Sequence, residues 1–416
     1  MGIPDLEAQI AYLRERMSAA ARRADAEMQE RRMRRPPPQG LSLAVPGREV
    51  GTPAGVHYES VSVMEGSRRH GNFEISRLAA LPPDLLAGIT EGEAPAAPPE
   101  TWVFLDTETT GLAGGSGTCA FLIGLGRVTA DGFEIRQFFM RDFCEEASQL
   151  HAVREALAEA QVLVTYNGKS FDIPLLETRY RMSRARPPFG SIPHLDLLFG
   201  ARRIWRLRLD SCRLTELETQ ILGHERDDDI PGELIPKAYF DFVRTGRAGK
   251  MGPVFLHNAL DIVSLACLTA VVASVFRDGG RAELRHAAEF VAMGRWLRQA
   301  GRLGEARELF REAVRRNLRE DLLFRTLWDL AAIERKLHAP DAAVSIYADL
   351  ASCPNAHRRD AMIELAKHYE HRERNLPMAL AFTEEARALA DDADLRRRRE
   401  RLLARAGQNG APRLEF

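Results

Sequence analysis

Paired cysteines and an excess charge of one sign are both missing from this sequence of 416 residues. Its five cysteines are scattered with no CxxC pair, which argues against a zinc site or a disulfide framework and fits a reducing cytoplasm. The formal net charge is only -1, so no overall positive field indicates a nucleic-acid partner. Any binding of nucleic acid must therefore rest on a local patch.

Long apolar runs are also absent. The most apolar stretch, residues 262–276, has 15 residues and is shorter than the roughly 20 that cross a bilayer. The first residues lack the apolar core and cleavage site of a secretory signal. We therefore expect a soluble cytoplasmic protein with no membrane contact, and 45% apolar residues are enough for two or three domains.

The first hundred residues differ in composition from the rest. Residues 1–35 carry eight arginines against six acids, with apolar positions at helical spacing, so we expect a solvated, charged helix. Residues 36–100 are rich in Gly and Pro. Within them VHYESVSV and NFEISRL alternate like the two strands of a β-hairpin around the turn EGSRRHG, and GEAPAAPPE before Thr101 is typical of a linker.

Residues 101–277 have the pattern of a mixed α/β domain. TWVFLDTE, CAFLIGLGRV and EIRQFFM predict three strands, with a hairpin turn at Asp131-Gly132 between the last two. EASQLHAVREALAEA predicts a helix, QVLVTYNG a fourth strand, and FDIPLLETRYRM a second helix. An apolar helix that begins near Val254 closes the domain. This order predicts a mixed central sheet flanked by helices.

Residues 281–405 are helical throughout and weakly repetitive. Small and aromatic residues recur there at the spacing of a tetratricopeptide repeat: Gly294, Gly301, Ala306, Phe310 and Ala313, then Ala343, Tyr347 and Leu350, then Ala379 and Ala386. We expect three degenerate helical hairpins. Such arrays usually bind proteins or brace a neighbouring domain.

Two acidic residues end the first predicted strand of the mixed domain. In FLDTETTGL, Asp106 and Glu108 are two positions apart, so both side chains project from the same face. Two anions side by side repel each other unless a cation lies between them. Acids at strand ends are often simply solvated, however, and this pair alone would favour that interpretation.

Two further acids follow in later motifs. TYNGKSFDIP leads from a strand through the turn Asn167-Gly168 to Asp172, near the start of a helix, where a plain helix cap is the alternative. In HNALD, His257 and Asp261 are four residues apart, about 40° around a helix axis, and therefore face one direction. An isolated HxxxD pair would more often lie on a solvated surface.

Taken in order, these motifs resemble the DEDD branch of 3′→5′ exonucleases in the ribonuclease-H-like superfamily. The fuller pattern looks most like the YprB-type ribonuclease-H-like domain family. The resemblance covers about residues 100–275 and rests on DTETTGL, NGKSFDIP, HLDLL, LDSCRLTELETQILG with DDDIPGELIP, and HNALDIVSL. The tetratricopeptide-like tail is similar to that family's as well. Three ordered motifs in this context make coincidence the weaker interpretation.

The resemblance implies a ribonuclease-H-like fold with a two-metal catalytic site. Its metal ligands would be Asp106, Glu108, Asp172 and Asp261, with His257 at the position of the general base. Oxygen ligands of this kind select Mg²⁺ or Mn²⁺ over zinc. Two such ions, about 3.5–4 Å apart, stabilise both the attacking and the leaving oxygen of a phosphodiester.

The same resemblance implies four contacts to the substrate. Thr109 and Leu112 would contact the terminal nucleotide, and Asn167 and Phe171 would lie near the substrate strand. Packing explains Leu112 and Phe171 equally well. Only the histidine departs from the family pattern: His257 precedes the last aspartate by four residues, as tyrosine does in one DEDD group, whereas the histidine group uses five. Its role as the general base therefore stays open.

Two charged segments lie between the second and third acidic motifs. Residues 179–213 contain nine arginines against two aspartates, and Trp205 lies among Arg202, Arg203 and Arg206, a combination suited to phosphate contact and base stacking. We expect a nucleic-acid-binding surface there, with a solvated helix face as the alternative. The acidic run ERDDD resembles a metal loop, but we expect an ordinary loop held by its own arginine and the neighbouring charges.

These observations predict a divalent-metal-dependent nuclease, a 3′→5′ exonuclease that acts on a single-stranded end or 3′ terminus of DNA or RNA. A nucleic-acid-binding scaffold with a vestigial site, which docks a protein partner through its repeats, is the alternative. In a third hypothesis the repeats define the function as a protein-docking platform. Neither the choice between DNA and RNA nor the choice between exonuclease and endonuclease follows from the sequence.

Overall fold

The structure, a computed structural model, describes residues 40–90, 92–111, 117–278 and 284–409, together with four positions near the N-terminus (15, 16, 19 and 23). The charged helix predicted for residues 1–35 therefore lies outside the described residues, apart from those positions. The chain divides into two compact units. The first comprises Met1–Gly200 with Arg213–Ala273, and the second comprises Ala201–Cys212 with Ser274–Phe416.

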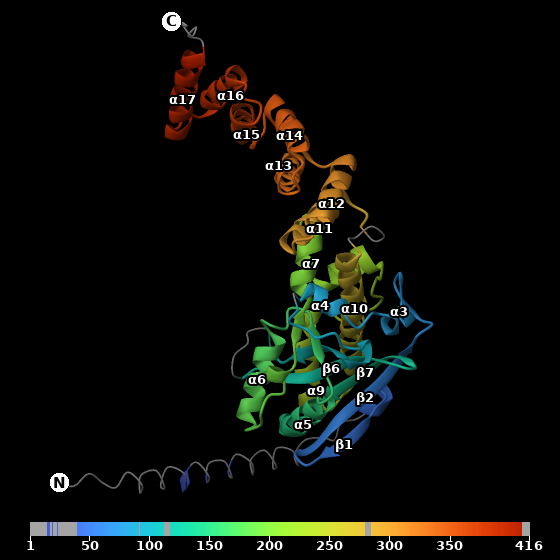
Figure 1. Cartoon of the computed structure of the whole chain (residues 1–416). Helices are drawn as coiled ribbons and strands as arrows, with labels where there is room; N and C mark the ends of the chain where they lie inside the picture. The colour runs from blue at the N-terminus through green and yellow to red at the C-terminus, as the bar shows by residue number, and fades with distance from the viewer. Residues whose placement is uncertain are drawn as a thin grey trace, which may run out of the picture. The chain divides into compact units, whose positions relative to one another are not determined.

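The first unit is built on a mixed sheet of seven strands: β1 (Arg48–Thr52), β2 (Gly55–Glu65), β5 (Trp102–Thr109), β6 (Ala120–Thr129), β7 (Gly132–Phe139), β8 (Val162–Thr165) and β9 (His194–Asp196). Figure 1 labels β1, β2, β6 and β7 of this sheet. The strand order is β1-β2-β7-β6-β5-β8-β9. Neighbours are antiparallel from β1 to β5, whereas β5, β8 and β9 are parallel. The predicted mixed central sheet is therefore confirmed.

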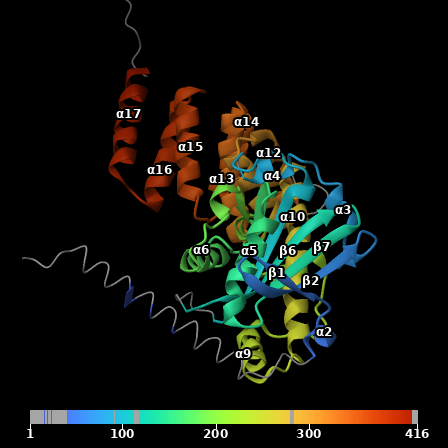
Figure 2. The ribbon, with the colours of Figure 1, turned by 90° about the horizontal axis from the view of Figure 1, so that it is seen from below.

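Residues 48–65 belong to this sheet, an addition that the sequence interpretation did not foresee. The segment VHYESVSV is a strand, but its hairpin partner is β1, and its other edge pairs with β7 (Figure 2). NFEISRL is not the partner: only β4 (Phe73–Glu74) is extended there, and it pairs with β3 (Arg69–His70). The short helix α3 (Ser76–Ala79) follows β4. Helical spacing therefore buries Ile75 and Leu78, which are three positions apart and both 1% exposed. A run this short fits helical spacing as well as alternation.

The segment GEAPAAPPE is packed rather than a free linker. Ala94 and Ala97 are 3% and 0% exposed. The indole Nε1 of Trp102, at the start of β5, donates a hydrogen bond of 2.9 Å to the carbonyl oxygen of Ala97. Small alanines between prolines let this segment lie flat against the core, so the predicted linker is corrected to part of the first unit.

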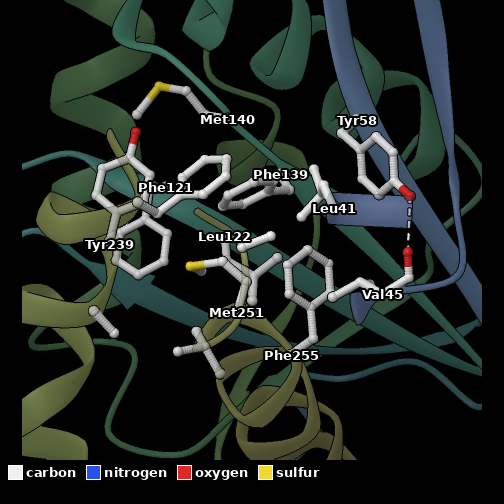
Figure 3. Packing of buried hydrophobic residues seen from close by; sticks show 14 of the residues in the cluster. Leu41, Val45, Tyr58, Phe121, Leu122, Phe139, Met140, Tyr239, Met251 and Phe255 are labelled. Atoms are coloured by element: carbon white, nitrogen blue, oxygen red, sulfur yellow. Dashed lines mark hydrogen bonds between the residues drawn. The ribbon is translucent and has the colours of Figure 1, made fainter. Parts of the chain in front are cut away.

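Helices cover both faces of the sheet: α2 (Leu41–Ala44), α3, α4 (Leu85–Ile89), α5 (Glu146–Ala156), α6 (Asp172–Met182), α8 (Leu214–Leu217), α9 (Ile235–Thr245) and α10 (Met251–Arg277). Side chains alternate along a strand, so each face carries its own apolar set. Ile123 of β6 belongs to the core under α5 and α6, whereas Leu122 belongs to the core against α9 and α10. In Figure 3 the second core gathers Phe121, Phe139 and Tyr239, and the Phe121 and Tyr239 rings stack with centroids 4.0 Å apart.

Among the described residues, α10 is the helix long and apolar enough to cross a membrane by length and composition, with a mean hydropathy of 2.2 in its most apolar window. However, 72% of that window is buried inside the structure. Two glycines of β6 allow this burial, because a Cβ at Gly124 or Gly126 would lie 2.3–2.4 Å from Ile262 of α10. The helix is thus a core element that packs directly on the centre of the sheet.

The second unit is helical, with α11 (Ala287–Gln299), α12 (Leu303–Arg315), α13 (Glu320–Lys336), α14 (Pro340–Ser352), α15 (Arg358–His371), α16 (Leu376–Leu389) and α17 (Ala393–Asn409). Consecutive helices pack against each other (Figure 1). A Cβ at Gly294 of α11 would lie 2.6 Å from the Phe310 ring of α12, which explains the small residue at that position. The helical C-terminal region is confirmed, and its assignment to tetratricopeptide repeats stays a prediction.

Candidate active site

Two acids share one face at the end of β5. In the antiparallel register with β6, Asp106 lies opposite Gly124 and Glu108 lies opposite Leu122. Because Gly124 has no side chain, α10 approaches this face closely enough to contact Asp106. Glu108 is only 9% exposed, so its carboxylate is largely removed from water. The strand therefore presents two carboxyl groups to the same helix, Glu108 buried and Asp106 partly buried.

The second acidic motif reaches the same strand end. Thr107, whose side chain projects to the other face, donates a hydrogen bond of 2.5 Å from its hydroxyl to Oδ1 of Asp172. Asp172 stands in the first turn of α6, and the N-cap position is Phe171. Its carboxylate is therefore directed to β5, which makes a plain capping role the weaker interpretation.

Asp196, at the end of β9, holds the turn that leads into α6. Its carboxylate is 2% exposed and accepts hydrogen bonds from the backbone N–H groups of Asn167 (2.7 Å) and Lys169 (3.1 Å). Asn167 adopts a left-handed backbone with a φ of 63°. The backbone N–H groups of such a turn need hydrogen-bond acceptors, and the Asp196 carboxylate provides them. The motif HLDLL contained this aspartate, but its spacing did not reveal what it binds.

Asn258 connects α10 to the sheet. It is 0% exposed, and its amide donates a hydrogen bond of 2.8 Å to Oδ2 of Asp106. Its side-chain oxygen accepts a hydrogen bond of 2.8 Å from Gln137 of β7. The residue lies inside the motif HNALD, where the sequence interpretation singled out only the histidine and the aspartate. Buried amides that are bonded on both sides fix the position of their helix.

The third motif places a histidine and an aspartate beside Glu108. His257 Nε2 lies 3.7 Å from Asp261 Oδ2 on successive turns of α10. One ligand atom from each of Glu108, His257 and Asp261 falls within 4.8 Å of the other two. The structure thus brings together residues of the first and third motifs, and Asp172 of the second motif is bonded to Thr107 of the same strand.

The electrostatics of these carboxylates are unfavourable without a cation. Burial raises the pKa of Asp106 and of Glu108 well above the ordinary range, and the neighbouring carboxylates raise both further. Burial also raises the pKa of Asp172, to about 6, although the hydrogen bond from Thr107 opposes the shift. The pKa of Asp261 is raised by burial and held back by the positive charge of Arg226. Clustered acids with raised pKa values typically mark functional sites.

The donor set fits a divalent metal. Carboxylate oxygens are the ligands that Mg²⁺ and Mn²⁺ prefer. A cation placed between Glu108 and Asp261, beside His257, would relieve the repulsion that raises these pKa values. The residues therefore fit the metal that the motifs implied.

The acidic run at 225–229 also reaches this site, which the sequence interpretation treated as a separate loop. Arg226 is hydrogen-bonded to Glu218, Asp229 and Asp261, and its side chain is 6% exposed. Asp229 lies 2.8 Å from Nδ1 of His257. These contacts agree with the expectation that Arg226 holds its neighbours. The contact with Asp261, however, makes the loop part of the carboxylate cluster. No periodicity or spacing links residue 226 to residue 261.

The residues predicted to contact the terminal nucleotide and the substrate strand have different surroundings. The Thr109 hydroxyl donates a hydrogen bond of 2.9 Å to the carbonyl oxygen of Gly111. Leu112 lies outside the described residues. Asn167 forms the turn before α6, and Phe171 is 59% exposed immediately before Asp172. An exposed aromatic ring next to a carboxylate cluster is suited to stacking on a base.

The arginine-rich segment is divided between the units: Ala201–Cys212, with Arg202, Arg203 and Arg206, belongs to the second, whereas the rest of the segment and the four carboxylates belong to the first. Trp205, in α7 (Leu197–Trp205), is 2% exposed, so a base cannot stack on it in this structure. Arg203 lies over the Trp296 ring, 5.1 Å from its centroid, and Arg206 donates to the carbonyl oxygen of Asp210. Arg202 is exposed. The indole is buried because it lies on the apolar face of an amphipathic helix, a fact that local charge did not reveal.

Comparison with known proteins defines the class to which this fold and site belong. Residues 103–273 match the family model of the ribonuclease H superfamily. That match covers the sheet from β5 onward, together with the helices that carry Asp172 and Asp261. Residues 103–273 are therefore a ribonuclease-H-like domain, and membership of this superfamily supports a nuclease-type function with nucleic acid as the partner.

The chain also has a relative that extends beyond this domain. Over 296 residues it is 32% identical to YprB of Bacillus subtilis (strain 168), an alignment that covers 70% of each chain. The chain therefore belongs to the same family as YprB. The relative is described only as an uncharacterized protein, so its description adds no activity.

Proposed function

We propose that this protein is a divalent-metal-dependent nuclease that hydrolyses phosphodiester bonds as a 3′→5′ exonuclease on DNA or RNA. The proposal rests on one observation above all: Asp106, Glu108, Asp172 and Asp261 meet at the end of β5, where burial and mutual repulsion raise their pKa values. Acids collected in this way repel each other unless a cation is bound among them. Superfamily membership supports hydrolysis of nucleic acid as the use of that cation.

Each residue has a part in the proposed reaction. The four carboxylates would hold two ions, Mg²⁺ or Mn²⁺, which supply positive charge at the attacking and leaving oxygens. His257 would accept a proton from the attacking water. With its Nδ1–H donated to Asp229, the imidazole keeps Nε2 as the acceptor on the side of Asp261. Phe171 would stack on a base next to the cleaved bond.

The test is a cleavage assay on the full-length protein. End-labelled single-stranded and double-stranded DNA and RNA are incubated with Mg²⁺, Mn²⁺ or EDTA. We expect metal-dependent release of nucleotides from the 3′ end of at least one substrate. Cleavage that persists in EDTA would contradict the two-ion mechanism, and internal cuts without stepwise shortening would contradict the exonuclease assignment.

One observation favours a second candidate, a nucleic-acid-binding scaffold with a vestigial site. Arg226 pairs with Asp261, and a permanent arginine in place of a metal ion would leave the protein without activity. A calorimetric titration with Mn²⁺ separates the two candidates. Binding of Mn²⁺ at the carboxylates supports the nuclease, and no binding supports the scaffold.

Two further parts of the proposal concern the rest of the chain. We propose that the helices α11 to α17 dock a protein partner, in the manner of tetratricopeptide repeats, and that the protein works in the cytoplasm. Close helix packing at Gly294 and Phe310 supports the first. Docking is tested by affinity capture of the partner with the surface of the second unit intact or altered. The location is tested by fractionation of cells.

A further inference from the structure

Arg226 is the residue at this site whose position the proposed mechanism leaves unexplained. Its guanidinium contacts three acids, of which Glu218 is 1% exposed and Asp261 belongs to the carboxylate cluster. Burying an arginine is costly, and the ion pair with Glu218 offsets its charge. The additional contact with Asp261 therefore places a fixed positive charge at the edge of the site.

The Glu218 pair holds Arg226 independently of the carboxylate cluster. Two parallel hydrogen bonds join the groups, from Nε of Arg226 to one oxygen of Glu218 (2.7 Å) and from Nη2 to the other (2.5 Å). Such a fork fixes the plane of a guanidinium as well as its position. If Asp261 turned to another cation, Arg226 would still be held at the same place.

The backbone around Glu218 is also braced. It lies in a π-helical turn, Glu218–Leu222, and its carbonyl oxygen accepts a hydrogen bond from the N–H of His224. The N–H of Asn72 donates to the carbonyl oxygen of Leu222 at 2.6 Å, and the rings of His70 and His224 lie 3.9 Å apart. The hairpin of β3 and β4 thus supports the turn that carries Glu218, and the fork to Glu218 makes Arg226 a preorganised group rather than a mobile surface charge.

We propose that Arg226 binds a non-bridging oxygen of the substrate phosphodiester. In the metal-free protein its Nη2 donates to Asp261 and offsets the charge of that carboxylate. When Asp261 serves a divalent cation instead, the Nη2–H that it accepted is released beside the site, while Glu218 and Asp229 retain the other hydrogen bonds of the guanidinium. Arginine stays charged at every working pH, and its planar donors match a phosphate. This inference rests on the proposed nuclease function and assigns Arg226 a role that a vestigial site would not have.

The decisive experiment compares two ligands. A short single-stranded oligonucleotide, in DNA and in RNA form, carries either a phosphodiester or an uncharged methylphosphonate as its 3′-terminal linkage. Binding is measured by fluorescence anisotropy in Ca²⁺. The test variant is Glu218→Gln with Arg226→Gln, which removes both members of the buried pair and leaves the net charge unchanged.

We expect the wild type to bind the phosphodiester more tightly than the methylphosphonate. The double variant should lose roughly 10- to 100-fold of this preference, because that factor corresponds to the free energy of a charged hydrogen bond. An undiminished preference in the variant would overturn the inference alone. The absence of any metal-dependent binding by the wild type would overturn the proposed function with it. The matched control is Glu59→Gln with Arg136→Gln, another forked pair with a buried glutamate, which should keep the preference.

A second measurement separates a phosphate contact from support of the metal ligands. Without nucleic acid, the double variant should bind Mn²⁺ in a calorimeter at least as tightly as the wild type, because Arg226 no longer competes for Asp261. A tenfold or greater loss would make Arg226 a scaffold for the ligands and overturn the inference. If the double variant does not fold, Arg226→Lys replaces it. Lysine keeps a cation beside Glu218 but has no fork, so about a tenfold loss of the preference is expected.

Discussion

Buried acids occur in both units of the chain, but their surroundings are opposite. In the second unit Glu370 is 1% exposed and accepts hydrogen bonds from Arg398, Arg401 and Arg405. Burial by itself would raise its pKa, and these arginines lower it below the ordinary value. In the first unit, burial raises the pKa of Asp106, and the neighbouring carboxylates raise it further.

The difference separates a structural ion pair from a site that requires something from outside the chain. The charge of Glu370 is balanced by residues of the same unit, so its network is complete when the protein has folded. The acids at the end of β5 repel each other, and Arg226 offsets only a part of their charge. A buried charge alone is therefore weak support for function. A structural ion pair has neighbours of opposite charge, whereas a functional site keeps neighbours of like charge that repel each other.

The largest expected effect is on cleavage. Asp106→Asn removes an anionic ligand at the centre of the cluster, so metal-dependent hydrolysis should fall to background. Glu370→Gln, which removes a buried carboxylate of the balanced kind, should leave cleavage at the wild-type rate. The assay is the initial rate on the substrate that the wild type cleaves best. Substantial activity in Asp106→Asn would contradict a functional role for the acids at the end of β5.

A smaller loss is expected for the histidine. His257→Ala should reduce turnover by about 10²- to 10⁴-fold, the usual contribution of a general base. Calorimetric binding of Mn²⁺ should change little, whereas Asp261→Asn should weaken both binding and turnover. If turnover of His257→Ala stays within several-fold of wild type, the metals alone activate the water and His257 only packs beside them.

Stability in EDTA should change in opposite directions at the two groups. Asp106→Asn relieves repulsion and should raise the melting temperature, whereas Glu370→Gln leaves three arginines without their negatively charged partner and should lower it. A charged hydrogen bond contributes about 1–3 kcal/mol, and each kcal/mol corresponds to about 2–4 °C in a domain of this size. Thermal melts followed by circular dichroism measure both. A loss of stability in both variants would show that the acids at β5 are structural as well.

The pH dependence of the metal-free protein follows from the same shifts. The pKa of Asp172 is about 6 in the folded protein against a usual value of 3.8, so the folded state binds more protons than the unfolded state between these values. Its contribution therefore makes the metal-free protein more stable as the pH falls from above 6 toward 4. Melts in EDTA across this range should show the rise, and saturating Mn²⁺ should flatten it. A profile that Mn²⁺ leaves unchanged would mean that the ion does not bind at these acids.

The smallest effect concerns the arginines of the second unit. Arg203 and Arg206 already have partners within the protein, over Trp296 and at Asp210. Replacing Arg202, Arg203 and Arg206 by Gln should lower the logarithmic salt slope of single-strand binding by about 0.7 for each phosphate contact that is lost. Anisotropy titrations at several salt concentrations give the slope. An unchanged slope would make this segment a solvated helix face.

The parts of the site differ in how far the sequence predicted them. Asp106 with Glu108, and His257 with Asp261, were predicted because their spacing places each pair on one side of a strand or helix. Asn258, Asp229 and the role of Arg226 were missed. Each of them contacts a residue that is distant in the chain or lies on another element. Only packing brings such partners together, and spacing carries no information about it.

The sequence by itself determined the order of β5 to β8 with α5, α6 and α10, and the helical character of the C-terminal region. Both depend on periodicity within short segments, which is a local property. Only the tertiary structure decided that β2 joins the sheet beside β7, that Trp205 is buried, and that Arg226 lies against Asp261. These outcomes depend on which distant surfaces exclude water from each other. The free energy of this burial depends on the whole packed molecule and not on any single segment.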